Sequence, residues 1–569
     1  MTFFFFFFLF FLLLLFSSVV LITTVQILGL DYEKTYDNEE DFNSLRYGSV
    51  MIMADQDHDG SHIKGLILNA LHVLFPSLLE RPNFIKAFIT PIVKIKLKKK
   101  DPKKAINEIS FYTIPDYEQW RKEQGDEVTK WNVKYYKGLG TSTALEARDY
   151  FTNLDSHIVP FRWGGDLDGE RLDMAFRKSR AEDRKQWLSR PLLSSSNNID
   201  NDNNTNTNNN TNNDYDTAID NSDEALCEEQ NNISMHSLNK DKEGTTMASF
   251  VDNELVLFSH ADNIRSIPSV VDGLKPSQRK VLYACFKRKL ITNEIKVAQL
   301  AGYVSEHTAY HHGEASLQST ITNMAQTFVG SNNIPLLYPS GQFGTRLQGG
   351  KDAASPRYIF TKLMNSARKI FPADDDPLLN YKDDDGLLVE PIHYVPIIPM
   401  ALVNGCDGIG TGWSTSIPRY NPIDLIHWID NKINIELGKE EKKNSKDDDV
   451  ENQKYIIPWV NGFVGSIEEL PMNGKDLKNR RFRSTGLIEQ LNSTTLEITE
   501  LPIGRWTDDM KNILSKLVSN NTVRLKNQKK VFEKGLSVLT TFTIIVVNNT
   551  FLLVHSSFIV LFHNHNFQN

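Results

Sequence analysis

An Asn- and Ser-rich run at residues 193–246 constrains this chain more than any other feature, because it cannot bury a hydrophobic core. It contains the string NNIDNDNNTNTNNNTNN. Within it, residues 197–229 hold nine Asp and Glu and no Lys or Arg. We therefore expect an acidic linker with folded blocks on either side of it.

The overall net charge of −8 conceals a basic block. Without the nine acids of the linker the balance is −8 + 9 = +1, and residues 271–371 carry 13 Lys and Arg against five Asp and Glu. A basic block favours a polyanionic partner. The three cysteines form no CxxC pair, which argues against a zinc ribbon or a disulfide scaffold.

The two ends of the chain, residues 1–26 and the tail at 518–569, do not resemble the rest, and both are strongly apolar, the tail from Leu536 onward. The first contains FFFFFFLFFLLLLF, which is long enough for a membrane span but lacks the basic residues of a signal peptide. One interpretation is a membrane-spanning segment at each end. We favour the other, translated non-coding sequence, because the interior is typical of a soluble protein that handles polyanions. A membrane partner is therefore not expected.

Residues 27–192 alternate short β-rich runs with helical patterns, as in an α/β unit. The apolar run Val50–Met53 predicts a buried parallel strand, and Ile63, Ile67, Ala70 and Leu71 recur at helical spacing.

An acidic cluster, Asp55, Asp57 and Asp59, follows the predicted strand. On an extended strand these carboxylates would share one face, and a divalent cation would relieve their repulsion. An EF-hand loop needs Glu at its twelfth position, where this chain has Leu66. The cluster therefore indicates a catalytic Mg²⁺ site, with a solvated acidic turn as the alternative.

A second segment, YYKGLGTS at residues 135–142, pairs glycines with a lysine and hydroxyls. Such a loop can approach a phosphate through its backbone amides, but it is not a Walker A loop. An ordinary turn is the favoured interpretation of this segment taken alone.

Beyond the linker, three apolar faces at helical spacing predict three short helices. The residues are Val281, Leu282, Cys285 and Phe286; then Val297, Leu300, Ala301 and Val304; then Leu317, Ile321, Met324, Ala325 and Phe328. With the glycine-rich loop GQFGTRLQGGKD and many Lys and Arg, they suggest a winged helix-turn-helix. The basic residues from Lys275 onward would neutralise phosphates.

An arginine and a tyrosine, Arg357 and Tyr358, follow the glycine-rich loop. A tyrosine can act as a nucleophile in phosphoryl transfer, and a guanidinium can stabilise the charge of the transition state. From this short string alone, packing of an exposed tyrosine remains the commoner explanation.

Taken together, these strings resemble one family, the eukaryotic topoisomerases II. The resemblance covers about Ile27–Leu192 and Ala248–Trp506. It rests on strings that include MIMADQDHDGSHIKG, YYKGLGTSTALEARDYF, SIPSVVDGLKPSQRKVLYACFKR, GQFGTRLQGGKDAASPRYIF and PIIPMALVNGCDGIGTGW. It implies an α+β multidomain fold with a partial TOPRIM α/β domain at 27–192, a winged-helix DNA-binding domain at 247–365 and a mixed α/β tower-like domain at 366–517.

The resemblance also implies site residues. Tyr358 would be the nucleophile that joins a DNA 5′-phosphate, and Arg357 its transition-state partner. Asp55 and Asp57 would hold Mg²⁺ (or Mn²⁺ or Ca²⁺), with Asp59 in support. Ile409 would be an apolar wedge that intercalates and bends the duplex. Further DNA contacts would come from Lys137, Lys275, Arg279, His311 and His312.

Three departures from the family pattern shape the expected activity. The family's ATPase domain, the EGDSA block with its catalytic glutamate, and the coiled coil with the C-terminal gate are not in this sequence. We expect the complete enzyme to be an ATP-dependent, homodimeric isomerase in the nucleus, or in an organelle, and this chain alone to be inactive. The rival is a catalytically inactive DNA-binding module, tethered to a membrane by residues 1–30.

Overall fold

The computed structural model describes residues 23–97, 108–112, 114–136, 138–190, 244–310, 312–384, 387–437, 456–470, 480–492, 495–519, 523–533, 537–546 and 559–563. The chain divides into two compact units, Met1–Asp262 and Asn263–Asn569. The mixed α and β organisation expected from the sequence is confirmed. Most of the expected linker and of the apolar start lie outside the described residues. Among the helices that are described, none is long and apolar enough to cross a membrane.

The first unit contains a four-stranded sheet of order β1-β2-β6-β7. Strand β1 (Val50–Met53) runs parallel to β2 (Ile85–Phe88), as the apolar run predicted. The expected burial holds only for Ile52, because Val50 and Met51 are half-buried and Met53 is exposed. Strand β6 (Ile158–Arg162) is antiparallel to β2, and β7 (Thr245–Thr246) is parallel to β6. The carboxyl end of β1 leads directly into the acidic cluster.

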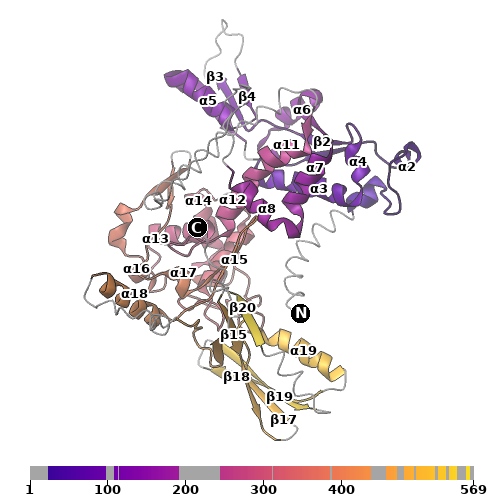
Figure 1. Cartoon of the computed structure of the whole chain (residues 1–569). Coiled ribbons are helices and arrows are strands. Elements are labelled where there is room, and N and C mark those ends of the chain that lie inside the picture. The colour runs from indigo at the N-terminus through magenta and orange to yellow at the C-terminus, as the bar shows by residue number, and fades with distance from the viewer. Residues whose placement is uncertain are drawn as a thin grey trace, which may run out of the picture. The chain divides into compact units, whose positions relative to one another are not determined.

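Helices surround this sheet (Figure 1). They are α2 (Glu39–Asn43), α3 (His58–Leu74), α4 (Pro76–Glu80), α6 (Ala144–Thr152), α7 (Asp166–Phe176), α8 (Ala181–Leu188), α11 (Met247–Phe250), a π-helical turn (Val251–Leu255) and the first part of α12 (Val256–Ser266), whose last turn, from Asn263, belongs to the second unit. The predicted helix is present as α3, and of its expected face Leu71 is buried, whereas Ile67 and Ala70 are only half-buried. Lys64 and Leu68 are buried, whereas Ile63 is half exposed. Burial of Lys64 is offset by an ion pair with the buried Glu254.

A smaller sheet of order β4-β3-β5 carries its own apolar cluster. Its strands are β3 (Val93–Leu97), β4 (Glu108–Phe111) and β5 (Trp131–Tyr135). Helix α5 (Ile114–Gln124) lies beside β3 and β4 (Figure 1). Edge-to-face aromatic pairs, including Trp120 with Trp131, hold this layer together.

The border between the two units differs from the expected one at 246/247. Residues up to Asp262 belong to the first unit, because β7 extends its sheet and Glu254 pairs with Lys64 on α3. A buried charge that is satisfied only within the first unit holds this segment there.

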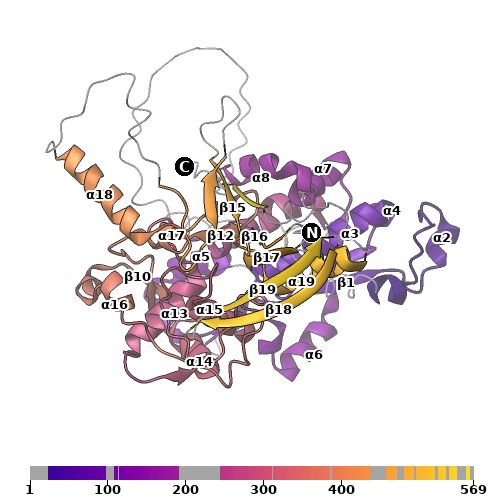
Figure 2. The same ribbon diagram turned by 90° about the horizontal axis from the view of Figure 1, so that it is seen from below.

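The second unit is built around the three predicted helices, α13 (Pro276–Lys287), α14 (Val297–His307) and α15 (Glu314–Ala325), which lie together in Figure 2. Their predicted apolar faces are buried, which confirms the helical pattern. The same hydrophobic cluster includes Tyr394, Val403 and Ile417. One core therefore spans the boundary that the sequence suggested at 365/366.

The other elements of this part of the second unit are short, except for α18. They are β8 (Ile295–Lys296), β9 (Phe360–Thr361), α16 (Ala367–Ile370), β10 (Tyr381–Asp384), β11 (Leu387–Pro391), α17 (Met400–Val403), β12 (Cys406–Ile409), β13 (Ser414–Ile417) and α18 (Pro422–Glu436). Strands β8 and β9 pair, as do β10 with β11 and β12 with β13.

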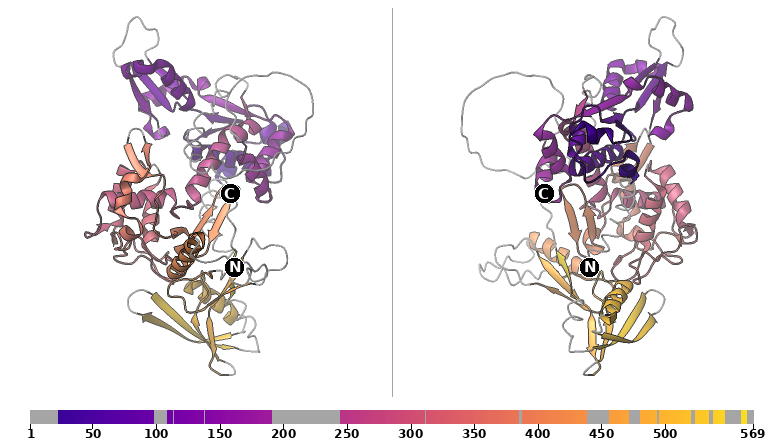
Figure 3. Two further views of the ribbon diagram at one scale, coloured as in Figure 1. Left: turned by 60° about the vertical axis from the view of Figure 1, so that its left-hand side comes forward. Right: turned by 90° about the vertical axis from the view of Figure 1, so that its right-hand side faces the viewer.

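The last strands of the chain form two further sheets, gold and yellow in Figure 3. One pairs β14 (Ser466–Glu469), β15 (Arg481–Thr485) and β20 (Ile559–His563); the other has the order β16 (Leu487–Gln490), β17 (Thr495–Glu500), β19 (Ser537–Val546) and β18 (Val523–Glu533). Helix α19 (Thr507–Ser519) shares a small core with β17. The described strands of the tail thus extend two sheets, and the many β-branched residues of β19 favour a strand.

Candidate active site and DNA interface

The acidic cluster lies where β1 passes into α3. Asp57 is the N-cap of α3, and its Oδ1 accepts a hydrogen bond of 2.7 Å from the Gly60 amide. Asp59 lies in the first turn of that helix. The expectation that Asp55, Asp57 and Asp59 converge along an extended strand is therefore wrong, because the helix begins at His58.

The YYKGLGTS segment, which the sequence favoured as an ordinary turn, lies against Asp55. The Leu139 amide donates a hydrogen bond of 2.7 Å to Asp55 Oδ1. A Cβ on Gly138 would lie only 2.7 Å from Asp55 Oδ2, so any larger residue here would push the Asp55 carboxylate out of its place. The lysine of the segment, Lys137, lies outside the described residues. No periodicity in the sequence could have shown that a residue 84 positions away holds Asp55.

The donors of this turn fit a magnesium ion in kind. Mg²⁺ takes hard oxygen ligands and is often bound by one or two carboxylates together with waters and substrate phosphates. Asp55 and Asp57 use Oδ1 in the hydrogen bonds above, which leaves Oδ2 of each as a ligand. Within the described ranges, no group of three His, Cys, Asp or Glu side chains gathers closely enough to hold a metal. The support from Asp59 as a third ligand is thus not seen.

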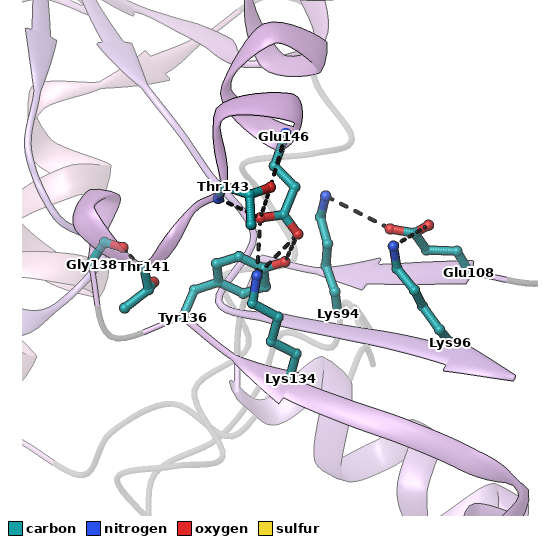
Figure 4. A network of polar contacts seen from close by, with 9 residues as sticks. All are labelled: Lys94, Lys96, Glu108, Lys134, Tyr136, Gly138, Thr141, Thr143 and Glu146. Atoms are coloured by element: carbon teal, nitrogen blue, oxygen red, sulfur yellow. Dashed lines mark hydrogen bonds and ion pairs between the residues drawn. The ribbon is translucent and has the colours of Figure 1, made fainter. Parts of the chain in front are cut away.

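Behind this turn, Glu146 on α6 is the centre of a polar network (Figure 4). It accepts hydrogen bonds from the Tyr136 hydroxyl, from Lys134 Nζ at 3.0 Å and from the Thr143 amide at 2.8 Å. Burial alone would raise the pKa of Glu146, but these bonds outweigh it and lower that pKa to about 2. Glu146 thus joins Tyr136, before the turn, to Thr143, after it, and the turn has its own hydrogen bond from Thr141 Oγ1 to Gly138 O.

The arginine–tyrosine pair projects from the second unit. Tyr358 is 73% exposed, and its ring lies 5.9 Å from the exposed guanidinium carbon of Arg357. The Tyr358 amide donates to Ser355 O at 2.9 Å, and the next residue, Ile359, is buried. The Ala298 amide at the start of α14 donates to Pro356 O at 3.1 Å. Backbone bonds therefore fix this turn, while the phenol and guanidinium face solvent.

The glycine-rich loop at residues 341–352 is packed against other parts of the second unit. Arg346 is 4% exposed, and its guanidinium lies 2.5 Å from Glu500 Oε1 and donates to Leu501 O at 2.6 Å. Gly349 lies so close to Trp506 that a Cβ would meet the indole at 2.3 Å. Arg346 is therefore a structural residue.

Arg279 was expected to contact DNA, but its guanidinium is buried. Arg279 is 3% exposed and forms a two-pronged ion pair with Asp272, at 2.7 and 3.0 Å. Asp272 is fully buried and also accepts from the Leu274 and Tyr394 amides. A charge satisfied in this way holds the loop to α13 and cannot reach a phosphate. The acid seven residues earlier in the sequence was the available signal for this pairing.

Three further residues, Lys275, His311 and His312, were expected to contact DNA. Lys275 is half-buried at the N-cap of α13, and its amide donates to Gln278 Oε1 at 2.9 Å. His312 is exposed, with its ring edge-on to Tyr310 at 5.4 Å. His311 lies outside the described residues.

The apolar wedge expected at Ile409 is at the end of β12, where the β12–β13 hairpin turns. Ile409 is 63% exposed, although it is a large aliphatic residue. The Gly410 amide donates to Trp413 O at 3.0 Å, which closes the turn. An exposed isoleucine at a hairpin tip is suited to insertion into an apolar or stacked partner.

Comparison with known proteins gives the family. A family model described as DNA gyrase/topoisomerase IV matches residues 265–550, and one described as the C-terminal associated domain of TOPRIM matches residues 88–263. The first match reaches residue 550. The expectation that the tail at 518–569 lies outside the family is therefore wrong for residues 518–550. The second match ends next to the border between the two units.

Curated relatives agree with these matches. The chain is 45% identical over 524 residues to "DNA topoisomerase 2, mitochondrial" of Dictyostelium discoideum, covering 92% of this chain and 35% of that protein. It is 47% identical over 496 residues to "DNA topoisomerase 2" of Saccharomyces cerevisiae, covering 87% and 30%. The chain thus spans about a third of the length of these relatives.

A solved structure agrees as well. The DNA-binding, cleavage and re-ligation domain of Plasmodium falciparum topoisomerase II matches with a TM-score of 0.62 and 43% identity, over 92% of this chain and 61% of that one. The family models, the curated relatives and the solved structure all indicate the same family. The chain therefore belongs to the eukaryotic type II DNA topoisomerases.

Proposed function

We propose that the chain is the DNA breakage and religation core of an ATP-dependent type II DNA topoisomerase. The observation that carries this proposal is the exposed Tyr358 beside Arg357, on a turn that backbone hydrogen bonds hold in place. A nucleophile that must reach a DNA phosphate has to project from the surface, and a nearby guanidinium can stabilise charge as the phosphate is attacked.

The proposed reaction is a reversible transesterification. The phenol oxygen of Tyr358 gives its proton to a base and forms a bond to phosphorus. The bond from phosphorus to the 3′ oxygen breaks, which leaves a 5′-phosphotyrosine and, after protonation, a 3′-hydroxyl. Attack by that hydroxyl reverses the step and reseals the strand. The phosphotyrosine bond preserves the energy of the original linkage, so ATP would drive the passage of the second duplex.

The metal belongs to the same proposal. Asp55 and Asp57 would hold Mg²⁺, or Mn²⁺ or Ca²⁺ in its place, through the carboxylate oxygens that the backbone bonds leave over. A bound Mg²⁺ would stabilise developing negative charge on the phosphate. Asp55 is aimed by the Leu139 amide, and Asp57 is fixed by its role as an N-cap.

The remaining assignments follow from the family. We propose that the first unit contains a TOPRIM domain, that the three helices with the loop at 341–352 form a winged helix, and that a tower-like domain follows. Ile409 would be the wedge that bends duplex DNA, with Lys275 and His312 near the backbone. We also propose a homodimer in the complete enzyme and location in the nucleus; one relative carries the word mitochondrial in its name.

The rival function is a DNA-binding module without catalysis. A duplex with sulfur in place of one 3′-bridging oxygen separates the two, because a thiolate leaves without help from a general acid. We expect the 569-residue chain with Mg²⁺ to form a 5′-linked covalent adduct with the sulfur duplex and almost none with the all-oxygen duplex. Tyr358→Phe should remove the adduct. Binding without any adduct would support the rival, and an adduct that survives Tyr358→Phe would exclude Tyr358 as the nucleophile.

A further inference from the structure

The hairpin that presents Ile409 lies against the last turn of α12. Two glycines make this contact possible. A Cβ on Gly408 would lie 2.5 Å from the carbonyl oxygen of Ser266, and a Cβ on Gly410 would lie 2.0 Å from Oδ1 of Asn263. Real Cβ atoms do not approach so closely, so the residues on both sides of Ile409 are pressed onto this turn of helix.

Asn263 also holds the hairpin by a hydrogen bond. Its Nδ2 donates to the carbonyl oxygen of Thr411 at 3.1 Å, across 148 residues of sequence. Its Oδ1 is buried and has no hydrogen-bond partner within the described residues. A buried polar atom without a partner costs free energy. The side chain keeps this orientation because the opposite one would place Oδ1 against the Thr411 carbonyl.

The position of this contact relates it to DNA bending. Separating a base step costs a few kcal/mol, and a wedge can do so only if its own support does not yield instead. Ile409 is 63% exposed, so contacts of its own side chain do little to hold it. The support must come from the backbone on either side, which is where Asn263 and the two glycines act.

We propose that Asn263 is a positioning residue for DNA bending, which fixes the β12–β13 hairpin so that Ile409 enters a base step. This inference rests on the proposed wedge role of Ile409. Asn263 does not touch DNA in this proposal; it acts through the Thr411 carbonyl and the Gly410 backbone. Its loss should therefore change the bend more than the affinity.

The test measures bending and binding separately in the full 569-residue chain. Energy transfer between dyes at the two ends of a short duplex reports the bent fraction at saturating protein, and anisotropy of the same duplex reports Kd. Asn263→Asp keeps the shape but replaces the donor with an anion that faces the Thr411 carbonyl, and Asn263→Ala removes the amide altogether. Asn253→Ala is the matched control, because Asn253 is exposed and donates only to Ser249 Oγ.

We expect both Asn263 variants to lower the ratio of bent to straight duplex by about 2- to 10-fold, the worth of one hydrogen bond. Kd should rise by less than about 3-fold, because Asn263 does not touch DNA in this proposal. Asn253→Ala should change neither the bent fraction nor Kd. Should Asn263→Asp fail to fold, Asn263→Ala decides alone. A normal bend in a folded Asn263→Ala variant would overturn the inference.

Ile409→Ala separates this inference from the function on which it rests. A lost bend in Ile409→Ala with a normal bend in the Asn263 variants would remove the inference and leave the wedge in place. A normal bend in Ile409→Ala would remove the wedge role and the inference together.

Discussion

The two candidate sites of this chain, the acidic turn of the first unit and the tyrosine turn of the second, hold their residues in opposite ways. In the acidic turn the side chains expected to do chemistry also hold the backbone: Asp57 caps α3 and Asp55 accepts from Leu139. In the tyrosine turn, backbone bonds do the holding, and the side chains of Arg357 and Tyr358 project outward.

This difference decides what mutagenesis can separate. A substitution in the acidic turn changes both a ligand and a structural hydrogen bond, so loss of activity and loss of stability come together. A substitution at Tyr358 leaves the backbone bonds of its turn intact. In the second unit, stability instead depends on other residues, the buried ion pairs of Arg279 with Asp272 and of Arg346 with Glu500.

The largest expected effect tests the independence of the tyrosine turn. Tyr358→Phe should lower adduct formation on the sulfur duplex by at least about 100-fold, because the nucleophile is gone. Its melting temperature should stay within about 1 °C of that of the original chain, since the lost hydroxyl faces solvent. Tyr338→Phe, at another exposed tyrosine of the same unit, is the control. A clear fall in melting temperature for Tyr358→Phe would break the comparison.

The next effect concerns what holds the second unit. Arg279→Ala should reduce the free energy of unfolding by about 3–5 kcal/mol, because it leaves Asp272 buried without its partner. Lys275→Ala should change the free energy of unfolding by less than about 0.5 kcal/mol. It should also make the slope of log K against log salt less negative by about one unit. Urea unfolding and DNA titrations at several salt concentrations provide the measurements. Equal effects of the two variants on the free energy of unfolding would contradict the structural role of Arg279.

A smaller effect should appear at Glu146 in the first unit, and it should depend on pH. The folded pKa of about 2 lies below the ordinary value of 4.5, so the stabilisation is complete above pH 4.5 and is lost as pH falls toward 2. Glu146→Gln should therefore cost about 1–2 kcal/mol at pH 7 and almost nothing near pH 2. Chemical denaturation across this pH range measures the difference. A cost that is independent of pH would exclude the ionised carboxylate as the cause.

The smallest expected effect separates the two roles of Asp57. Asp57→Ala should cost about 0.5–1 kcal/mol, because it removes the N-cap, whereas Asp57→Asn should keep the cap and cost less. Both variants should weaken the binding of Mn²⁺, followed by its electron paramagnetic resonance signal. Equal stability of the Ala and Asn variants would show that the cap contributes little, and the contrast between the two sites would then be weaker than proposed.

Local sequence patterns predicted the parts of the fold that local physics determines. The three helices after the linker are present, because their apolar residues are buried with the period of a helix. The parallel strand at Val50–Met53 is present as well, although only Ile52 of it is buried. The apolar tail was misjudged, because residues 537–546 form β19, which pairs with β17. Apolar composition alone does not distinguish a membrane span from a strand, and only the partner strand does.

Side-chain roles were less accessible, because they depend on partners far away in the sequence. Lys64 on the buried face of α3 is explained by Glu254, and Arg346 by Glu500. Family strings identified Tyr358, Arg357 and Ile409, and all three are exposed as their proposed roles require. The same strings included Arg279, whose guanidinium is buried. A resemblance carries the identity of a residue, whereas the direction of its side chain requires the structure.

The pairing of Arg346 with Glu500 and the neighbouring Leu501 has a consequence for synthesis on the ribosome. The guanidinium donates to a carbonyl 155 residues later in the chain. At about 5–20 residues per second, that carbonyl is made roughly 10–30 s after the arginine. During this interval Arg346 has neither of its partners and must stay hydrated, since an unpaired charge is too costly to bury. The glycine-rich loop can therefore reach its final packing only after most of the second unit has emerged.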